Sequence, residues 1–186
     1  MQISLDGFSS TGPNDEQKWV TWAWDEIKQE VLDLANSCDT ELIGRKLAVD
    51  YIPFWTDTLS QPESMMYEVA KIKEGQKKIV FSHTLKSTGW DSAKLSDQPL
   101  EELVPALKQQ AGKDILVGSR SLILQLMALN LIDEYQFCIH PVVIGSGLPL
   151  FENVTQRPIF NLVKTKTFGS GAITLYYEPA TSKTMG

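Results

Sequence analysis

Two kinds of apolar pattern alternate along the chain. Apolar residues three or four positions apart, with charged residues between them, predict amphipathic helices over residues 24–36 and 99–107. Short continuous apolar runs predict buried strands at residues 40–43, 78–82 and 114–117. Strands that alternate with helices in this way indicate an α/β domain with a mainly parallel sheet.

Local signals predict further element boundaries. Residues 60–63 have capping-box spacing with a proline in the first turn, which predicts a helix that starts there and stops at Gly75. Pro105 should kink the helix over 99–107 or shift its start. The apolar helix over residues 122–129 should end at Asn130, a residue that suits a C-terminal cap.

The two ends of the chain are predicted to be rich in strands. A short strand that begins at Ile3 should break at Gly7 into a polar loop over residues 8–14. Strict alternation predicts a strand from Tyr135 that runs past Pro141 to Ile144.

The last two strands should form a β-hairpin. Residues 162–168 and 172–178 flank Gly169-Ser170-Gly171, a typical hairpin loop. We therefore predict a three-layer α/β/α fold, with a mainly parallel central sheet and an antiparallel C-terminal hairpin. Residues 1–186 should form one domain, because we find neither a repeat nor a linker in them.

Composition narrows the class of function. The chain has 186 residues, 42% of them hydrophobic, which is enough for one core without a disulfide or structural metal. A net charge of -6 and no basic stripe disfavour nucleic acid as a partner. No apolar run reaches the roughly 18–20 residues of a membrane span, so we expect no membrane partner. Cys38 and Cys138 lie far apart in the sequence and no signal peptide precedes them. Both observations favour a reducing, cytoplasmic location.

Three turns after predicted strands combine small residues with polar or charged ones. They are Gly44-Arg45-Lys46, Gly118-Ser119-Arg120-Ser121 and Ser82-His83-Thr84. In a parallel sheet all three should lie at the carboxyl edge, where helix N-termini bind phosphate groups. Neither the Rossmann glycine pattern nor the P-loop pattern is present, so the phosphate site needs another precedent.

Several segments together resemble the dihydrofolate reductase superfamily. They are Ser4-Leu5-Asp6-Gly7-Phe8 and residues 42–46, 79–85 and 115–119, in that order. Residues 131–135 and the following segment His140-Pro141-Val142-Val143-Ile144-Gly145-Ser146-Gly147-Leu148-Pro149-Leu150-Phe151 resemble the reductase domain of the bifunctional riboflavin-biosynthesis deaminase-reductase. The zinc signature of the deaminase half is absent from the sequence, and we expect no metal site.

The resemblance implies NADPH as cofactor, bound across the three turns. Gly44, Arg45 and Lys46 match the segment that contacts the cofactor phosphates, and the turn at 82–84 matches the surroundings of the adenosine 2′-phosphate. Gly118 and Ser119 match the backbone that the pyrophosphate and nicotinamide approach, with Arg120 and Ser121 opening the next helix. The chain departs from the family at three positions, namely Leu47 for threonine, His83 for arginine and Ser119 for glycine.

Hydride transfer to a C=N or C=O bond also needs a proton, which a carboxylic acid of raised pKa can supply. The resemblance places this acid on the helix after the first loop, so Asp25 and Glu26 are the candidates, followed by Asp6 at the end of the first strand. Trp19, Trp22 and Trp24 could wall a flat heterocycle or fill the core.

These features predict an NADPH-dependent reductase of a small pterin-like or pyrimidine-like heterocycle, similar to the 5-amino-6-(5-phosphoribosylamino)uracil reductase. The alternative is a non-catalytic nucleotide-binding or dimeric scaffold of the same fold. We also expect a homodimer that buries the apolar strand over residues 135–144, a sheet edge or the tryptophans.

Overall fold

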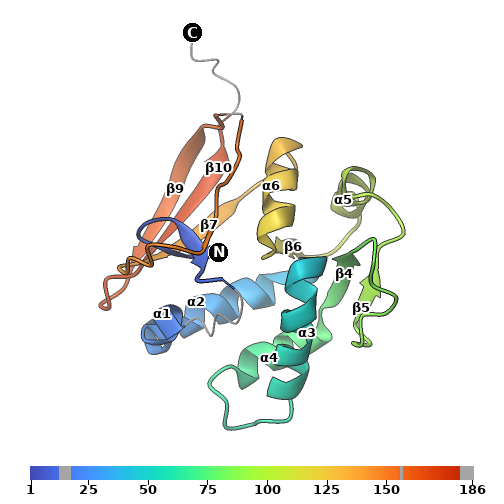
Figure 1. Cartoon of the computed structure of the whole chain (residues 1–186), viewed down its shortest axis with the longest axis horizontal. Coiled ribbons are helices and arrows are strands. Elements are labelled where there is room, and N and C mark those ends of the chain that lie inside the picture. The colour runs from blue at the N-terminus through green and yellow to red at the C-terminus, as the bar shows by residue number, and fades with distance from the viewer. Residues whose placement is uncertain (13–17, 156, 181–186) are drawn as a thin grey trace. The chain divides into compact units, whose positions relative to one another are not determined.

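The computed structural model describes residues 1–12, 18–155 and 157–180, which form two compact units. Unit 1 consists of the described residues within Met1–Lys28 and Asn130–Gly186, and unit 2 of Gln29–Leu129. Each unit contains one four-stranded sheet (Figure 1). None of the described helices is both long and apolar enough to cross a bilayer.

Unit 2 is built on a parallel sheet with the strand order β5-β4-β3-β6. Its strands are β3 (Cys38–Gly44), β4 (Lys77–Phe81), β5 (Ala93–Leu95) and β6 (Asp114–Val117). Its helices are α3 (Arg45–Thr58), α4 (Tyr67–Gly75), α5 (Leu100–Lys108) and α6 (Arg120–Ala128). Leu42, Ile43 and Val80 are almost fully buried, as expected for a parallel sheet covered on both faces.

Unit 1 is built on a mixed sheet with the order β1-β7-β10-β9. Its strands are β1 (Gln2–Ser4), β7 (Tyr135–His140), β9 (Phe160–Thr167) and β10 (Ile173–Pro179). β1 is parallel to β7, whereas β10 is antiparallel to both β7 and β9. A separate pair joins β2 (Phe8–Ser10) to β8 (Leu148–Pro149), and the helices are α1 (Lys18–Thr21) and the start of α2 (Trp24–Ser37).

The predicted class is confirmed, since α/β order, parallel strands and a C-terminal antiparallel hairpin are all present. The hydrogen-bonded strands form two four-stranded sheets, where the sequence predicted one central sheet. A single domain over residues 1–186 stays a prediction. Residues 13 and 14 of the predicted loop over residues 8–14 lie outside the described residues.

The predicted capping box at residues 60–63 is wrong. Helix α4 begins only at Tyr67, and residues 61–66 form successive turns or have no regular structure. The hydroxyl of Ser60 donates to the carbonyl oxygen of Asp57 at 2.7 Å, so this side chain closes the end of α3. A serine that follows one helix closely can cap that end as well as start the next.

The strand past Pro141 is also wrong, because β7 ends at His140. The expected loop at Phe8 is replaced by β2, which pairs with a strand far away in the sequence. Helix α5 continues through Pro105 to Lys108. β7 is paired on both sides, so it cannot provide a sheet edge for the dimer expected from the sequence.

Candidate functional site

The turn after β3 and the turn after β6 pack directly against each other in unit 2. The backbone N–H of Gly44 donates to the hydroxyl of Ser119 at 3.2 Å. A Cβ atom on Gly44 would lie 2.7 Å from the Oγ atom of Ser119 and 3.0 Å from that of Ser121. Glycine at position 44 therefore lets these two turns meet without displacing the serine hydroxyls.

Two helices begin at this junction, α3 at Arg45 and α6 at Arg120. In this part of the described chain neither helix start receives a side-chain cap, and neither first turn contains an acidic residue. The hydroxyl of Ser119, the residue before α6, is used by Gly44 instead. First-turn N–H groups and the positive ends of two helix dipoles thus meet at one edge, which is a setting for an anion.

Positively charged side chains and free space beside the backbone are found at the same edge of the sheet. Arg45 and Lys46 are exposed and Arg120 is half-buried. A Cβ atom on Gly118 would have no atom within 4 Å among the described residues, so space next to its backbone is open. A dinucleotide needs such positions, where phosphate oxygens meet cations and the backbone can be approached closely.

The third predicted turn follows β4 at the same edge, because Phe81 is registered with Gly44. The hydroxyl of Ser82 accepts the N–H groups of Thr84 at 3.1 Å and Leu85 at 2.9 Å, so this side chain shapes the turn. His83 and Thr84 are exposed. The structure therefore brings all three predicted turns to one edge of the parallel sheet, and their role in binding stays a prediction.

The three candidate carboxylates lie in unit 1. Asp6 is held in place there by hydrogen bonds. Its oxygens accept the hydroxyl of Ser4 at 2.6 Å and the N–H groups of Ile144 at 3.2 Å and Gly145 at 2.8 Å. The hydrogen bond from Ser4, helped by those from the backbone, lowers the pKa of Asp6 to about 2. Asp6 is thus ionised at neutral pH, which disfavours it as a proton donor.

Asp25 and Glu26 are both exposed in the first turn of α2. The Oε2 atom of Glu26 accepts the N–H of Ser170 at 2.8 Å, so this carboxylate binds the turn between β9 and β10. Among the tryptophans expected to wall a ring, Trp19 and Trp24 are buried and Trp22 is 52% exposed. All three candidate carboxylates are exposed, and among the described residues Asp25 is the one that holds no other segment by a hydrogen bond.

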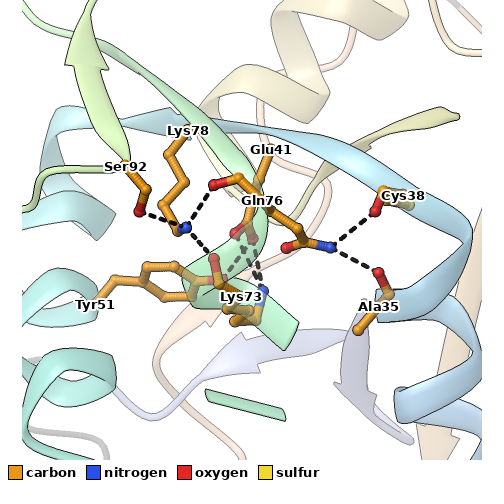
Figure 2. Close-up of polar contacts among 8 residues, drawn as sticks. All are labelled: Ala35, Cys38, Glu41, Tyr51, Lys73, Gln76, Lys78 and Ser92. Carbon is orange, nitrogen blue, oxygen red and sulfur yellow. Dashed lines mark hydrogen bonds and ion pairs between the residues drawn. The ribbon is translucent and has the colours of Figure 1, made fainter. Parts of the chain in front are cut away.

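A buried polar cluster in unit 2 was not predicted from the sequence (Figure 2). Glu41, in the middle of β3, accepts two hydrogen bonds from the ammonium group of Lys73 at 3.0 and 3.1 Å and one from the hydroxyl of Tyr51. The ammonium group of Lys78 donates to the carbonyl oxygens of Lys73 and Gln76 and to the hydroxyl of Ser92. Glu41 and Lys78 lie in two segments that the sequence predicts as buried strands, and Lys73 lies in α4.

This cluster stabilises the fold and lies away from the sheet edge at which the three turns meet. Glu41 lies three residues before Gly44, about 10 Å along an extended strand from the carboxyl edge. Burial lowers the pKa of Lys78 to about 8 and raises that of Tyr51 well above its usual value. The described residues contain no group of three side chains suited to hold a metal ion.

Known proteins resemble this chain over nearly its whole length. The RibD C-terminal domain family matches residues 1–174. The uncharacterised protein YyaP of Bacillus subtilis is 39% identical over 182 residues, which is 96% of this chain and 92% of YyaP.

Solved structures confirm the dihydrofolate reductase-like fold. A protein from Shewanella sp. PV-4 assigned to riboflavin biosynthesis has a TM-score of 0.73 at 19% identity, with 96% of each chain covered. RibD of Acinetobacter baumannii has a TM-score of 0.65 at 18% identity, with 96% of this chain and 56% of RibD covered. The chain thus belongs to the RibD C-terminal domain family, the family of the RibD reductase domain.

Proposed function

We propose that this chain is an NADPH-dependent reductase of a small heterocyclic substrate with a pyrimidine-like or pterin-like ring. Family membership supports a reductase, and the geometry of unit 2 supports a dinucleotide. The observation that carries the proposal is the junction of Gly44 with Ser119, which joins two uncapped helix starts at one sheet edge.

The residues at this edge fit NADPH in their chemistry. Arg45 and Lys46 would form charge-assisted hydrogen bonds with the phosphates, and the first-turn N–H groups of α3 and α6 would add to them. The open space next to Gly118 would admit the pyrophosphate or the nicotinamide. His83 and Thr84 would lie near the adenosine end, where the resemblance implies an arginine in place of His83.

The remaining chemistry needs a hydride and a proton. NADPH, when bound, supplies the hydride. We assign the delivery of the proton to Asp25, because Asp6 and Glu26 are engaged by backbone N–H groups. The riboflavin-biosynthesis relatives favour a pyrimidine-like ring as the acceptor.

Calorimetric titration with NADPH tests the cofactor site without a known substrate. Arg45→Ala removes charge-assisted bonds that contribute about 1.5–3 kcal/mol each, so the Kd should rise about 10- to 150-fold. The matched control is Lys77→Ala, which removes an exposed cation from the opposite end of β4 and should leave the Kd unchanged.

A second pair of variants tests the close approach to the backbone. Gly118→Val places a branched side chain into open space and should abolish NADPH binding at unchanged melting temperature. Gly75→Val, at another position with open space around it, should leave binding intact. Equal affinities for both variants and the wild type would contradict the proposed site and favour the non-catalytic scaffold.

A further inference from the structure

A row of polar side chains is buried on one face of the sheet in unit 1. Ser4, Cys138, His140 and Thr174 are 1%, 6%, 0% and 3% exposed. Ser4 is registered with His140, and Cys138 with Thr174. Residues opposite each other, or two apart on one strand, share a face, so these four side chains lie together. Buried sheet faces are normally apolar, so this row needs an explanation.

The imidazole of His140 uses only one of its two nitrogens for a side-chain hydrogen bond. Its Nε2 atom lies 2.6 Å from Oε1 of Gln2 and 3.7 Å from the sulfur of Cys138. Its Nδ1 atom is buried and has no hydrogen-bond partner among the described residues. Burial lowers the pKa of His140, which favours the neutral ring. With the Gln2 oxygen accepting from Nε2, Nδ1 presents a lone pair.

Thr174 contributes a second buried polar atom that lacks a hydrogen-bond partner among the described residues. Its Oγ1 atom is buried and, within the described part of the chain, has no partner. Thr174 is a diagonal neighbour of His140, because His140 extends β7 two residues beyond Cys138. Diagonal neighbours in a sheet lie about 7–8 Å apart, within reach of one small molecule. Buried polar atoms without partners lower stability, and a ligand that bonds to both would offset that loss.

An aromatic ring lies against His140. The indole of Trp19 meets the imidazole of His140 edge-on, with 5.6 Å between ring centroids and 86° between ring planes. Trp19 is buried, so its ring would have to move for a ligand to reach His140 from that side. A flat aromatic molecule could take over the contacts that the indole makes.

We propose that His140 and Thr174 form the polar floor of the substrate site and select a heterocycle with a lactam edge. The ring N–H of the lactam donates to Nδ1 of His140, and its carbonyl oxygen accepts from the hydroxyl of Thr174. This inference rests on the proposed function and narrows its substrate class. His140 and Thr174 hold and orient the ring, and they take no part in hydride or proton transfer.

Four proteins and two probes test this assignment by calorimetry. Pterin and 5-aminouracil, which both carry a lactam edge, are titrated without NADPH into the wild type, Thr174→Val, His140→Gln and His140→Asn. Thr174→Val should weaken binding about 3- to 10-fold, because one neutral hydrogen bond to the probe is lost. The same change removes a buried polar atom that has no partner among the described residues, so the melting temperature should rise. A purely structural threonine would not give this opposite pair of changes.

The two histidine variants separate ligand binding from packing. A glutamine amide reaches the position of Nε2, so His140→Gln should keep the contact with Gln2 and lose about 3- to 10-fold in affinity. An asparagine amide reaches the position of Nδ1, so His140→Asn should keep the affinity and lose stability. Equal binding by all variants, or no binding of either probe to the wild type at millimolar concentration, overturns the inference. Loss of NADPH binding alone, with both heterocycles still bound, would refute only the proposed function.

Discussion

The two sheets of this protein bury polar side chains in different ways. In unit 2 the ammonium groups of Lys73 and Lys78 are surrounded by acceptors from Glu41, the backbone and Ser92. In unit 1 the Nδ1 atom of His140 and the hydroxyl of Thr174 have no partner among the described residues. Satisfied polar groups rigidify a fold, whereas unsatisfied ones lower its stability until a ligand binds.

The carboxylates of unit 1 divide in the same way. Asp6 and Glu26 accept backbone N–H groups and hold two turns in place. Asp25 is exposed next to Glu26 in the first turn of α2. Hydrogen bonds to the backbone thus distinguish carboxylates that stabilise the fold from one that can take part in proton transfer. The following predictions test that distinction.

The largest effect is expected for turnover in Asp25→Asn. If Asp25 delivers the proton, the rate should fall about 10²- to 10⁴-fold, the usual contribution of a general acid, while NADPH affinity stays the same. The measurement is NADPH oxidation with the best substrate from a screen of dihydrofolate, the ribosylaminopyrimidine of riboflavin synthesis and small imines. Glu26→Gln is the matched variant, and a larger loss there would transfer the role to Glu26.

The next largest effect should be on stability, in Glu41→Leu. This change leaves the ammonium group of Lys73 buried without its carboxylate. The free energy of unfolding, measured by urea denaturation, should fall by about 3–5 kcal/mol. NADPH affinity should not change in the fraction that stays folded. The double variant Glu41→Leu, Lys73→Met should recover much of the loss, and its failure to do so would argue against a coupled pair.

A smaller effect is expected from pH, through Lys78. Burial lowers its pKa in the folded chain to about 8, from 10.5, so the unfolded chain binds more protons between these values. Unfolding free energy should therefore rise as pH increases from 8 towards 10, and this contribution is lost as pH falls through 8. Urea midpoints across this range measure it, and Lys78→Met should flatten the profile. An unchanged profile would place the titration elsewhere.

The smallest effect is expected on self-association, which concerns the outer edge of the sheet in unit 1. Within the described residues β9 pairs only with β10, and Leu162 and Val163 on β9 are each 54% exposed. We expect a homodimer that pairs these edges, in place of the interior strand β7. Sedimentation should give a dimer for the wild type and a roughly 10-fold weaker one for Leu162→Lys, about 1.4 kcal/mol. A monomer at micromolar concentration would refute the dimer.

Local signals in the sequence were enough for most of the fold and for the sheet edge at which the three predicted turns meet. The turns at Gly44 and Gly118 follow apolar strands directly and open helices, so both the elements and their common edge could be predicted. The pairing of β2 with β8 and the ion pair of Glu41 with Lys73 join residues distant in sequence, so no local pattern reveals them. For the same reason the sequence gives no sign that the Nδ1 atom of His140 lacks a partner among the described residues, because a missing partner is visible only in three dimensions.

The most direct test of the account is a calorimetric titration of the wild-type chain with NADPH and, in parallel, with NADH. The junction of Gly44 with Ser119 and the cations beside it predict saturable binding of NADPH at one site per chain, weakened by Arg45→Ala and by added salt. Absence of binding to either dinucleotide at millimolar concentration would contradict the account.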